Sequence, residues 1–310
     1  MPKVLLLIIA FIFLLLLPFL PSIIEIIFKR DKEPIPIDQH RTKEPDYFGK
    51  SFIKLLTKAF EDLNIQNISK LQLAYIQLKL KREEWVGVLN SEDLLETNVH
   101  TSIIFTQDAV FNHSHTFRRE LVVFGNAVFL SECVLRSLYV KGDCFVEAPL
   151  SVVRWVHVEG NLIIKSKADL GVSVYALEVK IRDRTTFKRA YAKKIDTSDK
   201  PLLDKNPTQE GRTININGSF SVKGSITIGD KEGPVVIDGD LFSDGDVQIE
   251  GNVWIKGNVF SQSSITLKNG VVIGIEGKVK SAVARGKIFI KGPVRIYGYL
   301  HSEKLVEVIP

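Results

Sequence analysis

A nine-residue pattern recurs along the C-terminal two thirds of the chain, with a central glycine flanked on each side by alternating apolar residues. The alternation has the period of a half-buried β-strand, whose successive side chains point to opposite faces. A single copy cannot bury its apolar face alone, whereas stacked copies can. The pattern therefore predicts a repeat protein, and its copies occupy residues 121–129, 138–146, 156–164, 214–222, 247–255 and 288–296.

The central glycine stands at an inward position, where glycine commonly marks a tight bend of a strand. The first three of these glycines are 17 and 18 residues apart, and steps of 6 appear later, as from Gly251 to Gly257. Rungs of this length with three short sides predict an all-β fold, a triangular β-solenoid (β-helix) around a column of aliphatic side chains. We expect solenoid corners at Gly125, Gly142, Gly160, Gly218, Gly239, Gly251, Gly257, Gly277 and Gly292.

Two other architectures share part of this pattern. A β-sandwich explains the alternation but not the regular glycines. The left-handed solenoid of many acyltransferases also advances in hexads, but it needs long uninterrupted runs of them. Here the hexads lapse between Gly257 and Gly277, which favours the right-handed form.

The amino-terminal segment contains an apolar run at residues 4–24, 21 residues long and without a charge. At about 1.5 Å per residue, a helix of this length crosses the roughly 30 Å hydrocarbon core of a bilayer. A cleaved signal peptide is the alternative, but its apolar run is shorter and no small-x-small site follows here. We expect an uncleaved, single-pass transmembrane helix in residues 1–28. The bulk of the chain is expected in the cytoplasm, because basic residues follow the span at Lys29, Arg30, Lys32, Arg41 and Lys43.

The segments between anchor and repeats differ in composition. A charged, proline-containing tether at 29–46 precedes a helical or mixed cap region at 47–98. In this region, residues 47–63 carry apolar side chains at the spacing of an amphipathic helix. The helix either caps the first open rung or lies on the bilayer, and its mixed charges favour the cap. The remaining segments are a first solenoid block at 99–192, an insertion loop at 193–212, a second block at 213–305 and an apolar tail at 306–310.

Basic residues cluster at the end of the first block, against the single acid Asp183. They form either a basic patch for lipid headgroups, an acidic polymer or a protein, or a solvated edge that resists unwanted strand pairing. The net charge of +5 is too small to indicate a nucleic-acid partner. The residues of this candidate basic patch are Lys180, Arg182, Arg184, Lys188, Arg189, Lys193 and Lys194.

Side chains that could carry chemistry are scattered. His113 and His115 alternate on one strand, but no acid or cysteine recurs near them at zinc-site spacing. The aspartates around Gly239 and Gly245 could form an acid/base couple, although aspartate beside glycine is commonly turn chemistry. Cys144 is expected in the core. We therefore expect no catalytic residue, cofactor or metal, and no enzyme. The alternative is a β-helix enzyme of envelope polysaccharide metabolism, or an acyltransferase, with clustered polar groups on one face.

Two stretches, VVIDGDLFSDGDVQIEGNVWIKGNVFS at 235–261 and VVIGIEGKVKS at 271–281, resemble the bactofilin family of polymer-forming bacterial cytoskeletal proteins. The resemblance is best over residues 213–300, and the first block matches only as a general solenoid. It implies a right-handed triangular β-helix that polymerises end to end without nucleotide and serves as a scaffold, often at the membrane.

The predicted function is a membrane-anchored, self-associating structural scaffold of the cell envelope. Its expected partners are other copies of itself, the membrane, and envelope or polysaccharide machinery. Self-association is expected at the last rung, although the apolar tail could instead cap that end. The candidate residues for self-association are Ile288, Ile290, Val294, Ile296, Leu305 and Val306.

Overall fold

The computed structural model describes Phe11 and residues 45–62, 74–79, 83–198, 213–229 and 233–310. The chain from Pro45 to Pro310 forms one compact unit. Apart from Phe11, the predicted anchor lies outside the described residues, as does nearly all of the predicted tether. Within the described residues, no helix is long and apolar enough to cross a membrane.

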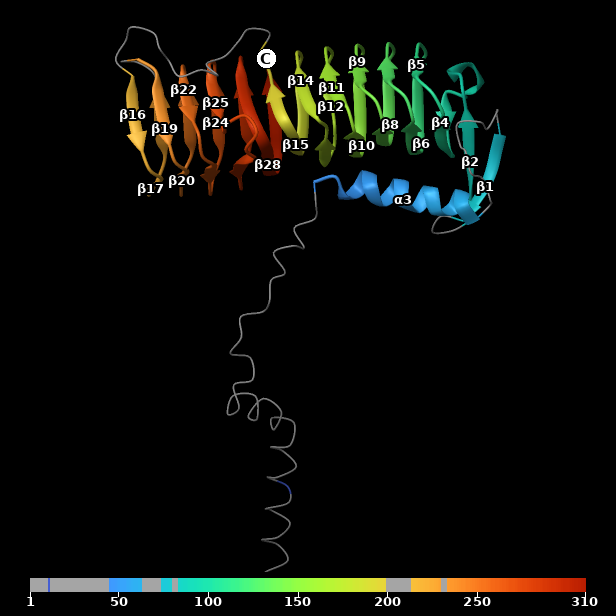
Figure 1. The fold of residues 1–310 in the computed structure, drawn as a ribbon, viewed down its shortest axis with the longest axis horizontal. Coiled ribbons are helices and arrows are strands. Elements are labelled where there is room, and N and C mark those ends of the chain that lie inside the picture. Colours follow the sequence, from blue (N-terminus) through green and yellow to red (C-terminus); the bar gives the residue numbers. More distant parts are fainter. Residues whose placement is uncertain (1–10, 12–44, 63–73, 80–82, 199–212, 230–232) are drawn as a thin grey trace, which may run out of the picture. The chain divides into compact units, whose positions relative to one another are not determined.

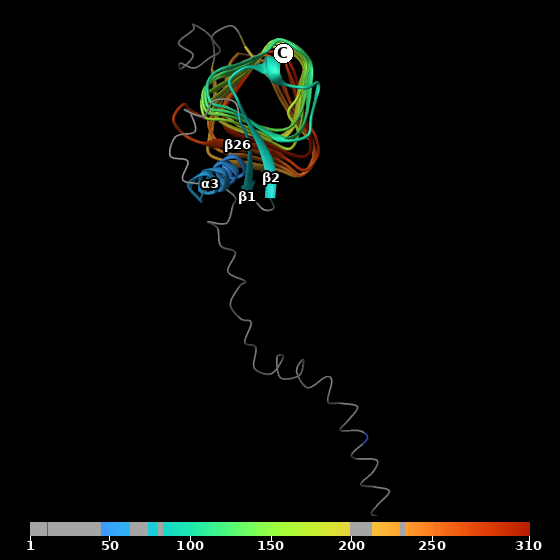
Figure 2. The same cartoon turned by 90° about the vertical axis from the view of Figure 1, so that its right-hand side faces the viewer.

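The compact unit is a β-solenoid of about 12 turns. Figure 1 shows its rungs side by side along one axis, and Figure 2, seen along that axis, shows the coils superimposed around a common interior. Within each block of the solenoid, a strand pairs in parallel with the strand one turn further along, as β7 (Ala127–Phe129) does with β9 (Cys144–Val146). The prediction of a β-solenoid is confirmed.

The strands form two blocks. The first block contains β3 (Asn98–Val99), β4 (Ser102–Phe105), β5 (Ala109–Phe111), β6 (His115–Val123), β7, β8 (Cys133–Val140), β9, β10 (Leu150–Val158), β11 (Asn161–Ile164), β12 (Ala168–Asp169), β13 (Ser173–Tyr175), β14 (Glu178–Ile181) and β15 (Thr185–Asp196). The second contains β16 (Ile214–Asn217), β17 (Phe220–Val222), β18 (Ile226–Gly229), β19 (Val235–Asp238), β20 (Leu241–Ser243), β21 (Val247–Glu250), β22 (Val253–Ile255), β23 (Val259–Ser261), β24 (Ile265–Lys268), β25 (Val271–Ile273), β26 (Lys280–Ala284), β27 (Ile288–Lys291) and β28 (Val294–Ile309).

The interior is a column of inward side chains stacked in register. Leu121, Leu138 and Val156 lie directly above one another on β6, β8 and β10, and all are fully buried. Cys133 and Cys144 are free thiols in the same column, and burial raises the pKa of Cys133 to about 11 and that of Cys144 to about 12. Both cysteines therefore act as small apolar core residues.

The glycines expected at corners lie in bends or turns between strands. Several stack on one another so closely that a side chain would not fit. A Cβ added to Gly142 would lie 2.8 Å from the carbonyl oxygen of Gly125, and one added to Gly160 would lie 2.7 Å from that of Gly142. The close approach of backbone at these corners explains why the repeat keeps glycine there.

The two blocks meet at their carboxyl-terminal ends. β15, the last rung of the first block, pairs antiparallel with β28, the last rung of the second block. All other pairings between solenoid rungs among the described strands are parallel. The second block therefore begins at the end far from the junction, with β16, and runs back toward β15 (Figure 1). We call the paired strands β15 and β28 the junction.

The structure moves several of the boundaries predicted from the sequence. β15 runs to Asp196, so the predicted insertion at 193–212 begins inside a strand. Residues 306–309 of the predicted apolar tail at 306–310 are the last part of β28. The solenoid also begins earlier than residue 99, because β2 (Glu83–Leu89) pairs in parallel with β4.

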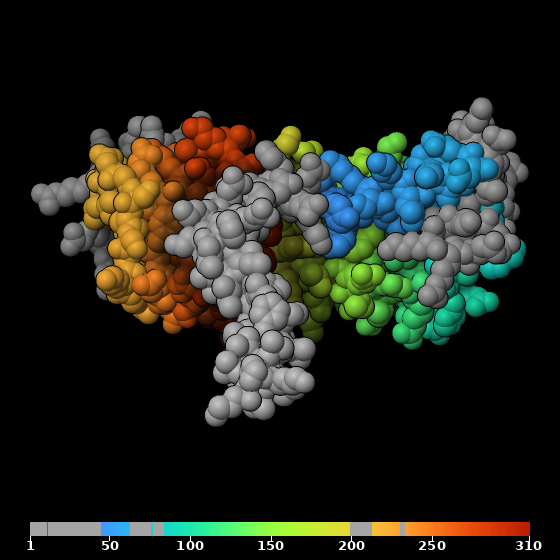
Figure 3. Space-filling model, turned by 90° about the horizontal axis from the view of Figure 1, so that it is seen from below, coloured from blue at the N-terminus to red at the C-terminus, as the bar shows by residue number. Residues whose placement is uncertain are grey.

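The one described helix of more than a turn, α3 (Tyr47–Asp62), lies along a side of the first block rather than over its end. Figure 3 shows it crossing the rungs of that block. The prediction that this helix caps the first rung is therefore wrong. Its apolar stripe packs on outward side chains of successive rungs and forms a second, smaller core. That core contains Leu56, Ala59 and Phe60 of the helix with Val86, Val88, Ile104, Val122, Tyr139 and Trp155 of the strands.

Candidate functional site

One end of the solenoid presents an incompletely covered rung, made of β16, β17 and β18, which we call the open rung. Each of its strands pairs with the next rung, β19, β20 or β21. Ile214 and Ile216 are 39% and 38% exposed, whereas Val235 and Ile237, at the same positions one rung inward, are 4% and 0% exposed. Phe220, Ile226 and Ile228 pack on the core but are only partly buried. The side chains of an interior rung are thus present at this end, and among the described residues no further rung covers them.

The composition of the open rung also distinguishes it from a protected edge. Natural edge strands are commonly blunted by charged residues or proline. Residues 213–229 contain a single charged residue, Lys223, and no proline. This low charge was visible in the sequence, but nothing in the sequence placed this rung at an end.

The opposite end of the solenoid is closed by the chain itself. β1 (Ala74–Lys79) pairs antiparallel with β2 on the first rung. The short 3-10 helix η5 (Glu92–Leu94) brings the buried carboxylate of Glu92 to the edge of β5. There, Oε1 accepts hydrogen bonds from the backbone N–H of Asn112 and from its Nδ2, both at 2.8 Å. An edge donor that would otherwise need another strand is thereby satisfied.

Glu92 also brings together the two histidines singled out in the sequence. Its oxygens lie 3.3 Å from Nδ1 of the exposed His113 and 3.6 Å from Nε2 of the buried His115. Burial pushes the pKa of Glu92 upward, but the hydrogen bonds from Asn112 and His113 outweigh it and hold that pKa below its usual value. Within the described residues, no group of three or more histidines, cysteines or acids could hold a metal ion.

The residues predicted to mediate self-association lie inside the molecule. Ile288, Ile290, Val294, Ile296 and Val306 are all fully buried, and Leu305 is partly buried. Ile288 and Ile290 on β27 are covered by β28, and β28 is in turn covered by β15, so neither rung is a free end. The expectation that a second copy stacks on this rung is corrected by the antiparallel pairing at the junction.

A buried ion pair ties the junction together. Nη2 of Arg295 on β28 lies 2.9 Å from Oδ2 of Asp196 on β15, and both side chains are less than a tenth exposed. Thr197 adds hydrogen bonds in both directions, since its Oγ1 donates to the carbonyl of Gly292 at 2.7 Å and accepts from the N–H of Val294 at 2.8 Å. These contacts join residues almost a hundred positions apart, and the sequence offers no signal for them.

The candidate basic patch is not a single surface. β15 runs along three sides of the solenoid, pairing with β12, β13 and β14 in turn, and its basic residues are distributed over those sides. Four of the seven are engaged locally: Arg182 donates to the carbonyls of Asp196 and Ser198, Arg184 pairs with Glu307, Arg189 lies over the ring of Phe48, and Lys194 lies near Asp196. The other three basic residues are exposed or partly exposed: Lys180, Lys188 and Lys193.

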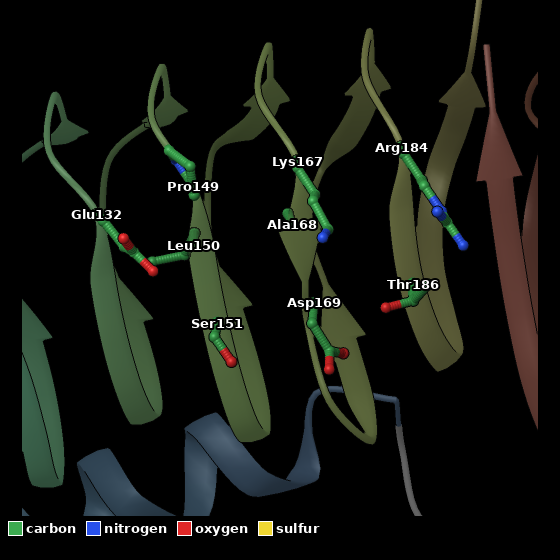
Figure 4. Close-up of a pocket in the computed structure, with 9 residues that line it drawn as sticks. All are labelled: Glu132, Pro149, Leu150, Ser151, Lys167, Ala168, Asp169, Arg184 and Thr186. Carbon is green, nitrogen blue, oxygen red and sulfur yellow. The ribbon is translucent and has the colours of Figure 1, made fainter.

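A shallow pocket of about 400 Å³ lies on the side of the first block that carries Ser151 and Thr186. Figure 4 shows its two carboxylates and two cations spread over successive rungs. Arg184 pairs with Glu307 at 2.7 Å, and Asp169 accepts a hydrogen bond from the N–H of Gly171 at 3.2 Å. Half of the charged groups in the pocket thus hold the local structure. The remaining charged groups are Glu132 and Lys167.

The aspartates beside glycine act as corner supports. Oδ1 of Asp240 accepts from the N–H of Asn258 at 2.6 Å, one rung along. Oδ1 of Asp246 accepts from Ser263 Oγ at 2.5 Å and from the N–H of Ser264 at 3.0 Å, and these bonds lower the pKa of Asp246. Both carboxylates hold the corner of the next rung, as expected of turn chemistry.

Beneath helix α3, a ladder of stacked rings runs across the rungs, which the sequence analysis did not foresee. His157 lies between Tyr139 and Tyr175 with ring centroids 5.2 and 4.7 Å away. Gly49 of the helix packs on this ring, because a Cβ at Gly49 would come within 2.6 Å of the Cβ of His157. His157 is 3% exposed, and burial lowers its pKa to about 4 despite the opposing pull of Glu159 and Asp46.

The buried histidine predicts a specific loss of stability in acid. His157 takes up a proton in the unfolded chain near its ordinary pKa of 6.5 but in the folded protein only near 4. Its contribution to stability is therefore complete above pH 6.5 and is lost as the pH falls toward 4, by about 3 kcal/mol in all. Urea unfolding at pH 7.5 and 4.5 should show this loss, and His157→Phe, which keeps a stacked ring, should remove it. An unchanged pH dependence in His157→Phe would contradict the assignment.

Comparisons with protein-family models, with curated proteins and with solved structures find no match to this chain. The features that bear on function are therefore the solenoid, its covered end and its open rung.

Proposed function

We propose that this protein is a membrane-anchored structural scaffold of the bactofilin type, with a right-handed β-solenoid that self-associates end to end without nucleotide. The open rung carries the proposal. Among the described residues, it combines interior side chains that are more than a third exposed, strand edges that no further strand pairs, and a single charge. Surfaces of this kind are templates for pairing with another chain. The resemblance over residues 213–300, which includes the open rung, supports the same function.

The proposal also assigns the anchor and the partners. Residues 1–28 span the membrane once, the solenoid lies in the cytoplasm, and envelope or polysaccharide machinery assembles on it. After cell fractionation, the full chain should sediment with membranes, and a variant lacking residues 4–24 should not. Protease added to sealed vesicles of known orientation distinguishes the two sides. A full chain recovered in the soluble fraction would contradict the anchor.

Self-association is tested by placing a charge in the open rung. On β18, the side chain of Ile226 points toward the interior of the solenoid, and that of the neighbouring Thr227 points outward. Sedimentation velocity of the full chain in mild detergent should show assemblies larger than a monomer. Ile226→Asp should return the chain to monomers, because the contact would bury an unpaired carboxylate. Thr227→Asp is the matched control and should assemble. A wild-type chain that stays monomeric at the highest concentration reached would contradict self-association.

A further inference from the structure

We propose that self-association stops at a dimer with two-fold symmetry, in which the open rungs of two copies pair antiparallel. This inference rests on the proposed function and adds the stoichiometry, the polarity and the register of the contact. The occupant of the open rung is thus a second copy of this chain.

The limit to two copies follows from the ends that each chain has left. An open filament needs two different attachable ends on every copy, whereas a contact between identical surfaces closes after two. In this chain the carboxyl-terminal ends of both blocks are used up in the junction. The amino-terminal end of the first block is covered by β1 and η5, with the Glu92 carboxylate on the edge donor of Asn112. Within the described residues, the open rung is the one end without such a cover.

The junction shows how two ends of this solenoid fit together. The first side of β15, Thr185–Phe187, pairs with the last side of β28, Val306–Val308, while the middle sides pair with each other through Ala190 and Leu300. The last side of β15 pairs with the first side of β28, through Ile195 and Ile296. In this antiparallel contact, the first side of each rung thus pairs with the last side of the other, and the two middle sides pair with each other. The interior column continues through it, since Ala190 and Leu300 are both buried.

The same exchange, applied to two open rungs, gives a self-complementary contact. β16 of each copy pairs with β18 of the other, and β17 pairs with β17. The centre of β17 is Ser221, flanked by the inward Phe220 and Val222, so Ser221 lies at the two-fold axis and faces its own counterpart. Because Lys223 is the single charge of the rung, the two copies meet with little repulsion.

Residues 199–212, which precede the open rung in the chain, are the competing occupant. Their sequence, DKPLLDKNPTQEGR, contains two prolines and alternates acids with bases. Proline lacks the N–H that a strand ladder requires, and charged residues oppose burial against Phe220 and Ile226. A second copy offers instead an identical triangle of strands, which satisfies all three sides at once.

The experiment is disulfide trapping of the full chain in mild detergent, together with its mass by light scattering. Ser221→Cys places an exposed thiol at the predicted axis, and the natural Cys133 and Cys144 are buried. Two cysteines at directly opposed antiparallel positions lie within the Cα separation that a disulfide spans. Under mild oxidation, most of the Ser221→Cys chain should migrate as a reducible dimer. Ser151→Cys, on the side of a middle rung, is the matched control and should remain largely monomeric.

The outcomes separate this inference from the proposed function. A mass of two chains together with trapping at residue 221 supports the dimer. A series of masses above two chains would overturn the dimer while leaving a self-associating scaffold. A two-chain mass without trapping at residue 221 would overturn the predicted register and the two-fold axis through β17. A monomer that traps at neither position would overturn both the dimer and the scaffold, and would favour the cover by residues 199–212.

Discussion

Replacement of Asp196 with alanine is expected to lower the free energy of unfolding by about 3–5 kcal/mol, because it leaves a buried guanidinium without its carboxylate. The partner, Arg295, has a side chain that is 5% exposed and lies 2.9 Å from Asp196 across the junction. Among the described strands, the pairing of β15 with β28 is the one that joins the two blocks. Chemical denaturation of the wild type and the variant, followed by circular dichroism, measures the difference.

Two controls separate a buried pair from charge loss in general. Glu147→Ala removes the Lys165–Glu147 pair, whose side chains are 54% and 33% exposed, and should cost less than about 1 kcal/mol. The double variant Asp196→Leu, Arg295→Met should recover most of the lost stability, because an apolar pair of similar volume is often neutral in such a site. If Asp196→Ala costs no more than Glu147→Ala, the ion pair does not hold the two blocks together.

Truncation of Phe111 to alanine is expected to cost about 3–5 kcal/mol of unfolding free energy, as is typical of a large aromatic residue removed from a packed core. Phe111 is fully buried and stacks on Phe129 with ring centroids 4.7 Å apart. It also meets Phe105 and Phe117 edge to face, at 5.5 and 6.0 Å. The cavity left by the ring would lie at the centre of the column, where neighbouring rungs cannot move inward to fill it.

The matched control is Phe145→Ala on the same side of the solenoid. Phe145 lies on β9 at an outward position, partly exposed, next to the inward Cys144 and Val146. Its removal should cost only roughly 1 kcal/mol or less, in the range of surface substitutions. Equal costs at Phe111 and Phe145 would mean that inward and outward positions do not differ, which would contradict the dry interior column.

The repeat itself was predictable because its causes are local. Alternation with period two determines which side chains face inward, and glycine at an inward position marks a corner. Leu138 and Cys144 illustrate this, because the pattern alone places both in the interior and both are fully buried. Asp240 and Asp246 were likewise recognisable as turn residues, because each lies beside a glycine. In the structure, their hydrogen bonds reach the corner of the adjacent rung.

The features that bear on function could not be predicted in the same way. Helix α3 has the pattern of an amphipathic helix, but that pattern does not distinguish an end from a side. Gly49 of the helix packs closely on His157 of β10, and this contact places the helix along a side of the solenoid. The basic residues of β15 are neighbours in sequence but face different sides of the solenoid, because the strand turns through all three.

Spacing along the chain therefore established that this protein coils into a solenoid, where its corners lie and what fills its interior. It did not establish which ends of the solenoid are free. The closing of β28 against β15 joins segments about a hundred residues apart, and no local pattern specifies such a contact. Whether an apolar rung is core or interface depends on what lies above it, and only the folded chain shows that Ile296 is buried while Ile216 is 38% exposed.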